Sequence, residues 1–435
     1  MKVISINGVT IPQSDIISIS TVNESLDHVG DTIVGSQSTI VLNNVEGAYD
    51  ERVSTSLFYS TDWYNSDVTI FDTEVNLTIF TGKIKKYSID DTTKRVTITV
   101  NDIFVDMNDV VCICSLSAKT PAEVVYTILT DPDGMNTPED RIVRGTFDTA
   151  IAYQASLGIT IEVNYLAKDN IKVFDAIRTI CSYTGAALYM KDNRIIYLQR
   201  KPYNGELGRN LYDKDIVVGS VRQISGDLPI YNAYDILYKT GSSVGSVSGV
   251  NYLSKVKYGV TNTFTVPQSG RSGSSATDYK ALFSSPEAAT AAGELILSMF
   301  AYRRTKIEFT LSLDYGDIML GDIVIAQFRP YTNEPILVTD ITKNVEKRTI
   351  HVKGELVNYY RTVALDTTPP DKPSILGCLY NYNQQRLYLE VSYDPTVSGY
   401  YVYVSRDGTF SDMVICGDKL SPFKPETFIY GKKYL

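Results

Sequence analysis

A hairpin-like pattern occurs twice in this chain, about 255 residues apart. In the first copy Asp67 opens a strand-like run, and the alternating residues 94–100 begin 27 positions later. In the second copy Asp322 opens the run, and residues 347–352 begin 25 positions later. A further alternating segment followed by a polar turn lies inside each copy, at residues 82–89 and 336–341. Such segments are typical of β-hairpins, so we expect two similar β modules in one chain.

Two similar modules in one chain have a consequence for assembly. Three copies of the chain could present six similar surfaces around a ring. Chance similarity is the alternative explanation, because short alternating strands and lysine-rich turns are common in β proteins. The matched spacing of the two copies favours the repeat.

The length and composition fit a folded protein of several domains. With 435 residues, the chain is long enough for about three domains of the usual size. It has 43% hydrophobic and 21% charged residues, and no apolar run approaches the roughly 18 residues of a membrane-spanning helix. Residues 1–8 predict a short strand and lack the apolar stretch of a signal peptide. We therefore expect the chain to fold in the cytoplasm.

The charge balance argues against a protein that grips nucleic acid. The net charge is −9 and the pI is near 5.0, whereas such binding depends on clustered Lys and Arg. A surface that DNA passes without binding is compatible with this charge. Tyrosine is abundant, with 32 residues against 14 Phe and 1 Trp, which fits half-buried sheets and protein–protein contacts alike.

The five cysteines form no recognisable framework. Cys112 and Cys114 lie in a strand-like run, Cys181 lies on a predicted helix, and Cys378 and Cys416 lie near the end. The odd count and the spacing match no zinc pattern. We therefore expect buried free thiols.

The pattern of elements in the first half predicts a mainly β protein with an α+β insert. Residues 1–110 contain short alternating strands and predict a first small β-barrel module. Residues 111–215 predict an α+β module with helices at about 121–130 and 171–184. The first helix begins with a capping box and a proline after Thr120, and the second ends at Gly185.

The second half is predicted to resume the β pattern. Residues 216–364 predict a second, similar β-barrel module with a helix at about 286–303. Two Gly/Ser-rich segments, 241–249 and 269–275, predict exposed loops. Residues 365–435 predict a proline-stiffened linker followed by the strands of a β-sandwich.

No set of residues matches a catalytic or metal-binding motif. His28 and His351 are far apart, and no Gly-rich segment has the Lys-Ser/Thr ending of a phosphate loop. Three groups of acidic residues could in principle pair carboxylates for sugar cleavage, or in one case bind calcium, but each lies in a predicted turn. These groups are Asp90 with Asp91, Asp131 with Asp133, and Glu46 with Asp50 and Glu51. We therefore predict that the chain is not an enzyme and has no catalytic, cofactor-binding or metal-binding residues.

The order of these elements resembles that of the central hub proteins of phage tails, found in the baseplate or tail tip, and of related contractile machines. In that family a barrel precedes a helix that leads into a hairpin, and a second barrel is entered through an Ala-rich helix. The resemblance spans roughly residues 30–360. It is carried by residues 80–84, 173–198, Asn232, 287–303 and 320–324.

This resemblance implies a structural protein of the virion, placed at the tail tip or baseplate and assembled in the host cytoplasm. A homotrimeric ring would close the tail tube, adapt the six-fold tube to a three-fold tip and let DNA pass during genome ejection without specific binding. The implied partners are the tail tube or distal tail ring protein above, a tip or fibre protein below, and the tape-measure protein in the channel. No cofactor is implied.

The segment after the linker resembles a fibronectin type III domain, with residues 399–403 at the position of its third strand. Tyr393 stands near the place where that family usually has a tryptophan. About 65 residues follow the linker, whereas such sandwiches take roughly 90 to 100. We therefore expect the last strands to lie beyond Leu435 or to come from a neighbouring subunit.

Two other functions stay open on sequence grounds. A host-receptor-binding or adhesin component would use the sandwich and the tyrosine-rich faces, although a free adhesin should carry an export signal and residues 1–8 do not resemble one. A cell-wall hydrolase would need a carboxylate cleft or a set of zinc ligands.

Overall fold

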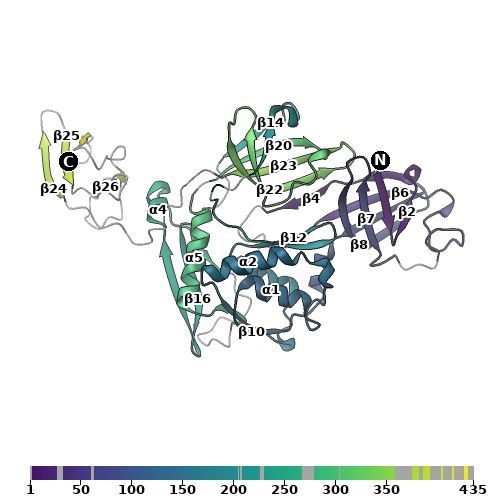
Figure 1. The fold of residues 1–435 in the computed structure, drawn as a ribbon, viewed down its shortest axis with the longest axis horizontal. Helices are drawn as coiled ribbons and strands as arrows, with labels where there is room; N and C mark the ends of the chain where they lie inside the picture. The colour runs from purple at the N-terminus through teal and green to yellow at the C-terminus, as the bar shows by residue number, and fades with distance from the viewer. Residues whose placement is uncertain are drawn as a thin grey trace. The chain divides into compact units, whose positions relative to one another are not determined.

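The chain folds mainly into β-sheets and forms two compact units, Met1–Leu365 and Asp366–Leu435 (Figure 1). The mainly β class predicted from the sequence is therefore confirmed. In this computed structural model the first unit is described for residues 2–26, 33–59, 63–203, 205, 208–225, 230–266, 279–302 and 304–357.

The second unit is described by the backbone of its strands. These are β24 (Ile375–Asn381), β25 (Arg386–Val391), β26 (Tyr403–Val404), β27 (Val414–Ile415) and β28 (Glu426–Ile429). β24, β25 and β28 form one antiparallel sheet, and β26 pairs with β27. The fibronectin III assignment stays a prediction, and the side chains of Tyr393, Cys378 and Cys416 lie outside the described residues.

The first unit contains a seven-stranded sheet built from the start of the chain. Its strands, in spatial order, are β2 (Val9–Ile11), β1 (Lys2–Ile6), β7 (Asp67–Asp72), β8 (Leu77–Asp90), β9 (Arg95–Asn101), β6 (Gln37–Asn43) and β3 (Ile16–Ile19). Apolar side chains alternate along β9, where Val96, Ile98 and Val100 are buried, as expected for a sheet with one face on a core.

A second seven-stranded sheet is built mainly from residues beyond 208. Its strands are β14 (Arg209–Tyr212), β21 (Ile323–Gln327), β22 (Glu334–Asn344), β23 (Thr349–Leu356), β20 (Thr305–Ser312) and β15 (Arg222–Ser225), with β4 (Val22–Ser25) paired to β22. Among the described residues neither seven-stranded sheet closes on itself by backbone pairing, so the predicted barrels take the form of open sheets. The strand that follows β3 in sequence, β4, joins the other sheet instead.

The predicted repeat is confirmed in the strand order. The run β7-β8-β9-β6-β3 of the first sheet has the same order as β21-β22-β23-β20-β15 of the second. Both central hairpins contain one register shift, at Ile84/Lys86 in the first sheet and at Val338/Asp340 in the second. We call residues 2–101 without β4 and β5 the first module, and the second seven-stranded sheet without β4 the second module.

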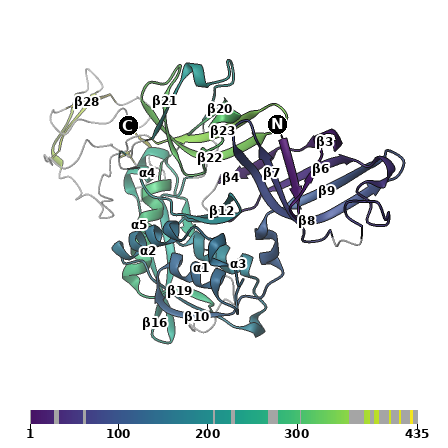
Figure 2. The same ribbon diagram turned by 45° about the vertical axis from the view of Figure 1, so that its right-hand side comes forward.

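The two modules are joined by strand exchange and by a shared core. β4 pairs antiparallel with β22, and Figures 1 and 2 both place it alongside that strand. One continuous apolar cluster contains residues of both modules, including Ile40 and Ile98 of the first and Phe309 and Ile350 of the second. Because both modules bury side chains in the same cluster, we expect them to fold as one cooperative body.

An α+β body packs its own core beside the modules. A six-stranded sheet consists of β10 (Cys114–Lys119), β11 (Ile161–Tyr165), β19 (Ala281–Phe283), β16 (Ala233–Thr240), β17 (Ser243–Val250) and β18 (Thr263–Thr265). A three-stranded sheet consists of β13 (Arg194–Leu198), β12 (Ala187–Lys191) and β5 (Ile33–Val34). The helices are α1 (Pro121–Thr130), α2 (Arg144–Ser156), α3 (Val173–Ser182), α4 (Tyr252–Tyr258) and α5 (Pro286–Phe300). The range 216–364 thus supplies strands to two bodies, and the predicted domain boundaries stay predictions.

The helices predicted at about 121–130, 171–184 and 286–303 are confirmed as α1, α3 and α5, whereas α2 and α4 were not predicted. The Thr120 side chain accepts the N–H of Glu123, and Pro121 is the first helical residue of α1. Gly185 has φ +63° just after α3, as a helix-ending glycine requires. α2 carries few apolar residues, and its buried positions include the polar Gln154, so it lacks the apolar stripe that marks a helix in sequence.

The Gly/Ser-rich segment 241–249, predicted to be an exposed loop, is instead mostly strand β17. Tyr238 lies directly opposite Gly245, and Tyr234 lies directly opposite Gly249. A Cβ atom added at Gly249 would lie 2.5 Å from the Tyr234 ring. The glycines therefore leave room for cross-strand tyrosine rings, which is how aromatic residues stabilise glycine-containing strands. The segment 269–275 lies outside the described residues.

The Tyr234 ring generates the first prediction. It is buried between β17 and α5, where a Cβ added at Gly293 would come within 2.6 Å of it. Ala is normally favoured over Gly in a helix by about 1 kcal/mol, but here the overlap should dominate. We expect Gly293→Ala to lower the free energy of unfolding by about 1–3 kcal/mol, measured by urea denaturation.

Gly145 in α2 is the matched control, since no atom lies within 4 Å of a Cβ placed there. Gly145→Ala should be neutral or slightly stabilising. An unchanged or raised stability of Gly293→Ala would contradict the packing role of the Tyr234 ring.

Candidate functional site

The acidic groups named from the sequence lie in turns, as predicted. Asp90 closes β8, and its Oδ1 accepts the backbone N–H groups of Thr92 at 2.8 Å and Thr93 at 3.1 Å. The hydrogen bond from the Thr93 side chain is the main cause of a lowered pKa at Asp90. Asp131 likewise accepts the N–H of Asp133 at 2.8 Å in the turn after α1. These carboxylates stabilise turns.

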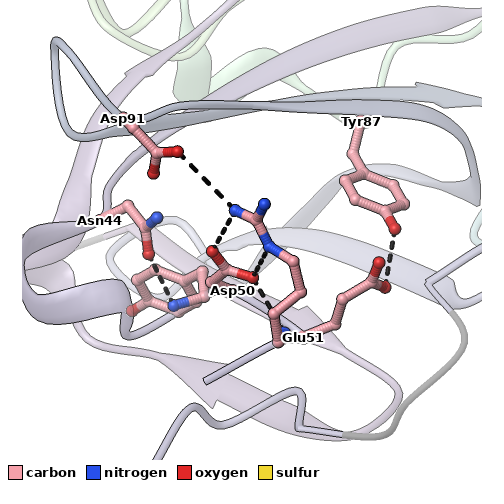
Figure 3. Close-up of polar contacts among 7 residues, drawn as sticks. Asn44, Asp50, Glu51, Tyr87 and Asp91 are labelled. Atoms are coloured by element: carbon pink, nitrogen blue, oxygen red, sulfur yellow. Dashed lines mark hydrogen bonds and ion pairs between the residues drawn. The ribbon is translucent and has the colours of Figure 1, made fainter.

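The structure brings Asp50 and Asp91 together around one cation (Figure 3). Arg52 donates to Asp50 through Nε at 2.8 Å and Nη2 at 2.6 Å, and Nη2 also lies 3.8 Å from Asp91 Oδ2. The hydrogen bond from Arg52 lowers the pKa of Asp50. Glu51 accepts the hydroxyl of Tyr87 at 2.7 Å. The cluster fastens residues 44–52 to the β8–β9 hairpin and does not place two carboxylates across a cleft.

The remaining candidates show structural roles where they are described. His351 lies half-buried in β23, with Nδ1 3.2 Å from Thr310 Oγ1, and His28 lies outside the described residues. Cys112, Cys114 and Cys181 are buried free thiols, as predicted, and burial raises the pKa of each. In the described part of the chain no group of three or more His, Cys, Asp or Glu residues is placed to hold a metal ion.

A cavity of about 240 Å³ lies beside the end of α5. Its walls include Phe300, Leu337 and Leu356, and among the described residues that line it the one carboxylate is that of Glu355. Glu355 is buried and paired with Arg304. Glycoside hydrolysis by the usual mechanism needs two carboxylates that flank one bond. The described lining of this cavity supplies one carboxylate, which is already in an ion pair with Arg304.

The most informative surface is the hairpin end of each module, where the same backbone hydrogen bonds recur. In the first module Asn44 donates to the carbonyl of Lys94 at 2.7 Å. In the second module Leu313 donates to the carbonyl of Arg348 at 2.9 Å. Lys94 and Arg348 both have positive φ, at 52° and 54°. The two turns are therefore built alike, and Lys94 occupies the place of Arg348.

The start of the repeat is also shared, but displaced by one residue from the sequence match. Ile84 bonds to Asn65 and Ser66, and Val338 bonds in the same way to Gly321 and Asp322. Asp322 therefore takes the place of Ser66 and not that of Asp67. The sequence comparison matched two aspartates, whereas the backbone pairing decides the register.

The modules differ most in the connection that follows β6 or β20. Residues 44–66 form the connection in the first module, whereas residues 313–322 suffice in the second. The longer connection buries Tyr49, Phe58 and Trp63. The Phe58 ring contacts those of Tyr49 and Trp63, and the Trp63 ring stacks on Tyr87 of β8. This aromatic set anchors the connection to the sheet, so its outer side chains are held in place.

The hairpin end of the second module is covered by the first module of the same chain. The Arg348 guanidinium forms an ion pair with Glu74, and Glu346 accepts the N–H of Ile19 at 3.3 Å. Leu77 packs so closely over Gly316 that a Cβ there would lie 1.9 Å from its methyl group. The corresponding end of the first module, at residues 91–94, is exposed.

Exposed large apolar side chains concentrate in two stretches of the described chain. Val45, Leu57, Tyr59 and Tyr64 lie in the connection of the first module and are each more than half exposed. Tyr212, Val217, Val218 and Ile224 lie on β14, β15 and the residues between them, and Val218 is 99% exposed. Clusters of this kind mark surfaces that bind other proteins.

A buried acidic residue lies near the junction of the modules. Asp102 is fully buried after β9 and accepts the N–H groups of Ser36 and Phe104. Burial raises the pKa of Asp102 to about 7, against the lowering effect of these two hydrogen bonds. Glu24 of β4 lies close by and pairs with Lys343 of β22.

Asp102 generates the second prediction. Because its pKa is raised above the ordinary 3.8, the folded state keeps a proton that the unfolded chain releases, so stability should fall as the pH rises from about 4 to about 7. Asp102→Asn removes this titration. We expect the variant to show a flatter pH dependence of the free energy of unfolding, by roughly 1 kcal/mol or more over that interval.

Asp133→Asn, in an exposed turn, is the control and should leave the pH dependence as in the parent chain. If Asp102→Asn had the same slope as the parent between pH 4 and 7, the raised pKa would be wrong.

Comparisons with known proteins find similarity in structure only. No known family model and no curated protein matches the sequence. A 43 kDa tail protein of prophage MuSo2 from Shewanella oneidensis matches with 10% identity and a TM-score of 0.47, over 82% of this chain and 98% of that protein. Prophage tail protein gp18 from Listeria monocytogenes matches with 10% identity and a TM-score of 0.45, over 81% and 94%.

A third similar structure is an Escherichia coli component of the type VI secretion system, described as similar to bacteriophage T4 tail proteins gp27 and gp5. It matches with 10% identity and a TM-score of 0.44, over 89% of this chain and 88% of that protein. In the described part of this chain, no helix has the length and apolar character that crossing a membrane requires. These three similar structures are phage tail proteins and a related secretion component.

Proposed function

We propose that this chain is a structural protein of a phage or phage-like tail, and that three copies form a ring that closes the tail tube. The observation that carries the proposal is the duplicated module, with the same run of five strands and the same turn hydrogen bonds. Two equivalent modules per chain give three copies six module positions. Such a ring can adapt a six-fold tube to a three-fold tip.

Each module serves as one barrel-like position of the ring, and the tube or a distal tail ring protein binds above it. The tip or fibre protein binds below, and the tape-measure protein occupies the channel. DNA passes through during genome ejection. The charge of the chain supports this role, since a net charge of −9 repels phosphate groups.

A receptor-binding or adhesin role is the alternative, and the exposed tyrosines of the first module, Tyr59 and Tyr64, are the observation that favours it. Purified chain that bound host cells as a monomer would support that alternative over the ring.

The ring generates the third prediction. Both modules lie in the first compact unit, before residue 366. Deleting residues 366–435 should therefore leave trimers intact, as measured by light scattering of the purified chain with and without its tube protein. A full-length chain that stays strictly monomeric under both conditions would remove the ring proposal. Loss of trimers only in the truncated chain would assign the second unit to the ring.

The channel generates the fourth prediction. If DNA slides through the ring, basic side chains should point toward neighbouring side chains or solvent and not line the channel. Lys85, for example, forms an ion pair with Asp106. We expect the same orientation of Lys86, and of Arg303, which lies outside the described residues. The purified chain should therefore show no measurable retention of duplex DNA at physiological salt in a gel-shift assay, since retention requires clustered cations. Tight, salt-sensitive binding would contradict a passive channel.

A further inference from the structure

We propose that the exposed hairpin end of the first module binds the second module of another copy of this chain, at the turn of residues 329–334. This inference rests on the proposed ring and names the surfaces that would build it. Its template is the contact that the two modules already make within one chain.

Within the chain, the second module inserts its hairpin turn, residues 345–348, between two parts of the first module. Arg348 pairs with Glu74 in the turn between β7 and β8. Glu346 accepts the N–H of Ile19, the last residue of β3. The receiving surface is thus an edge strand and the neighbouring turn.

Every element of this contact has a counterpart elsewhere in the described part of the chain. Lys94 occupies the place of Arg348, as the turn hydrogen bonds show. The β7–β8 turn corresponds to residues 329–334, because Asn76 and Asn333 both have positive φ immediately before β8 and β22. The edge strand β3 corresponds to β15. The same contact between two copies would therefore place residues 91–94 of one copy between β15 and the turn 329–334 of the next.

The charges on these two surfaces are complementary. Lys94, in the place of Arg348, would approach the turn 329–334. There the carboxylate is that of Glu334, one residue after Asn333, whereas Glu74 of the template lies two residues before Asn76. Asp91, whose side chain is 73% exposed and lies 3.8 Å from Arg52 Nη2, would approach Arg222 on β15. The described residues show no ion pair for Lys94 or Glu334 within the chain. Opposite charges on the two surfaces favour their association.

The exposed apolar side chains fall on the same two surfaces. Val45 and Leu57 flank the hairpin end of the first module, while Tyr212 and Ile224 flank the turn 329–334. Hydrogen bonds hold that turn in place, from the Arg329 N–H to Asp213 and from the Tyr331 hydroxyl to Gln223. Both surfaces thus combine apolar area with a charged rim, as protein interfaces do.

One difference from the template decides which side chains make the apolar contact. Gly316 accepts Leu77 of the other module, but at the corresponding Gly47 the space is filled by Val53 of its own connection, 2.8 Å from a Cβ placed there. The connection therefore fills the space over Gly47 itself, and it presents the exposed side chains of Leu57 and Tyr59 on its outer surface. The contact between copies should use these side chains and be wider than the contact within the chain.

The two surfaces are different parts of the chain, so the contact is head to tail. A head-to-tail contact closes into a ring when the rotation allows it, whereas a self-complementary contact gives a dimer. This distinction makes the proposal testable with single cysteines.

The experiment uses the full chain with Cys378 and Cys416 replaced by Ser, since the other three cysteines are buried. Lys94→Cys and Glu334→Cys are introduced separately and together, and a short bis-maleimide is added at concentrations where light scattering shows trimers. We expect covalent trimers from the double variant, dimers from a mixture of the two single variants, and monomers from either single variant alone. Lys94→Cys combined with Asp133→Cys is the matched control and should stay monomeric on a denaturing gel.

A charge reversal tests the same contact without a cross-linker. Lys94→Glu and Glu334→Lys should each weaken trimers by about two- to fivefold, and the double variant should restore them, as for an exposed ion pair. Trimers that form without any cross-link between residues 94 and 334 would overturn this interface and leave the ring proposal intact. Dimers from one single-cysteine variant alone would show a self-complementary contact. A parent chain that never forms trimers would overturn both.

Discussion

The pairing of β4 with β22 is the constraint on which the rest of the first unit depends. A strand from residues 22–25 completes a sheet whose other strands begin beyond residue 208. The pair is reinforced by the buried ion pair of Glu24 with Lys343, and both modules share one apolar cluster. Removing one partner of such a buried pair leaves an uncompensated buried charge, so replacing either Glu24 or Lys343 alone would destabilise the fold. The α+β body is fixed to the same frame, because β5 pairs with β12.

The two modules have similar backbones, but their hairpin turns lie in different surroundings. The turn of residues 345–348 is covered within the chain, while the turn of residues 91–94 is exposed. The longer connection of the first module adds an aromatic anchor, Tyr49, Phe58 and Trp63, and carries apolar side chains outward. In the proposed ring, the duplicated module provides one contact inside the chain and leaves the equivalent contact for a neighbouring copy.

Several acidic residues that suggest chemistry in the sequence serve the fold instead. Asp50 and Asp91 share Arg52, and Asp90 closes a turn. Asp102, which no sequence motif marks, has a pKa that burial raises, because it follows β9 into a buried site shared with Glu24 of β4. Its burial depends on strands far apart in sequence, so only the folded chain identifies it.

The sequence by itself determined the elements whose signals are local. Alternating polarity specified the two hairpins, and the capping residues around Thr120 and Gly185 specified α1 and the end of α3. Tertiary structure decided what depends on distant partners. Segment 241–249 became a strand because Tyr234 and Tyr238 cover its glycines, β4 left its neighbours for β22, and Asp322 took the place of Ser66. Local periodicity reports which face a residue prefers, whereas pairing between strands is fixed by contacts that no short stretch of sequence contains.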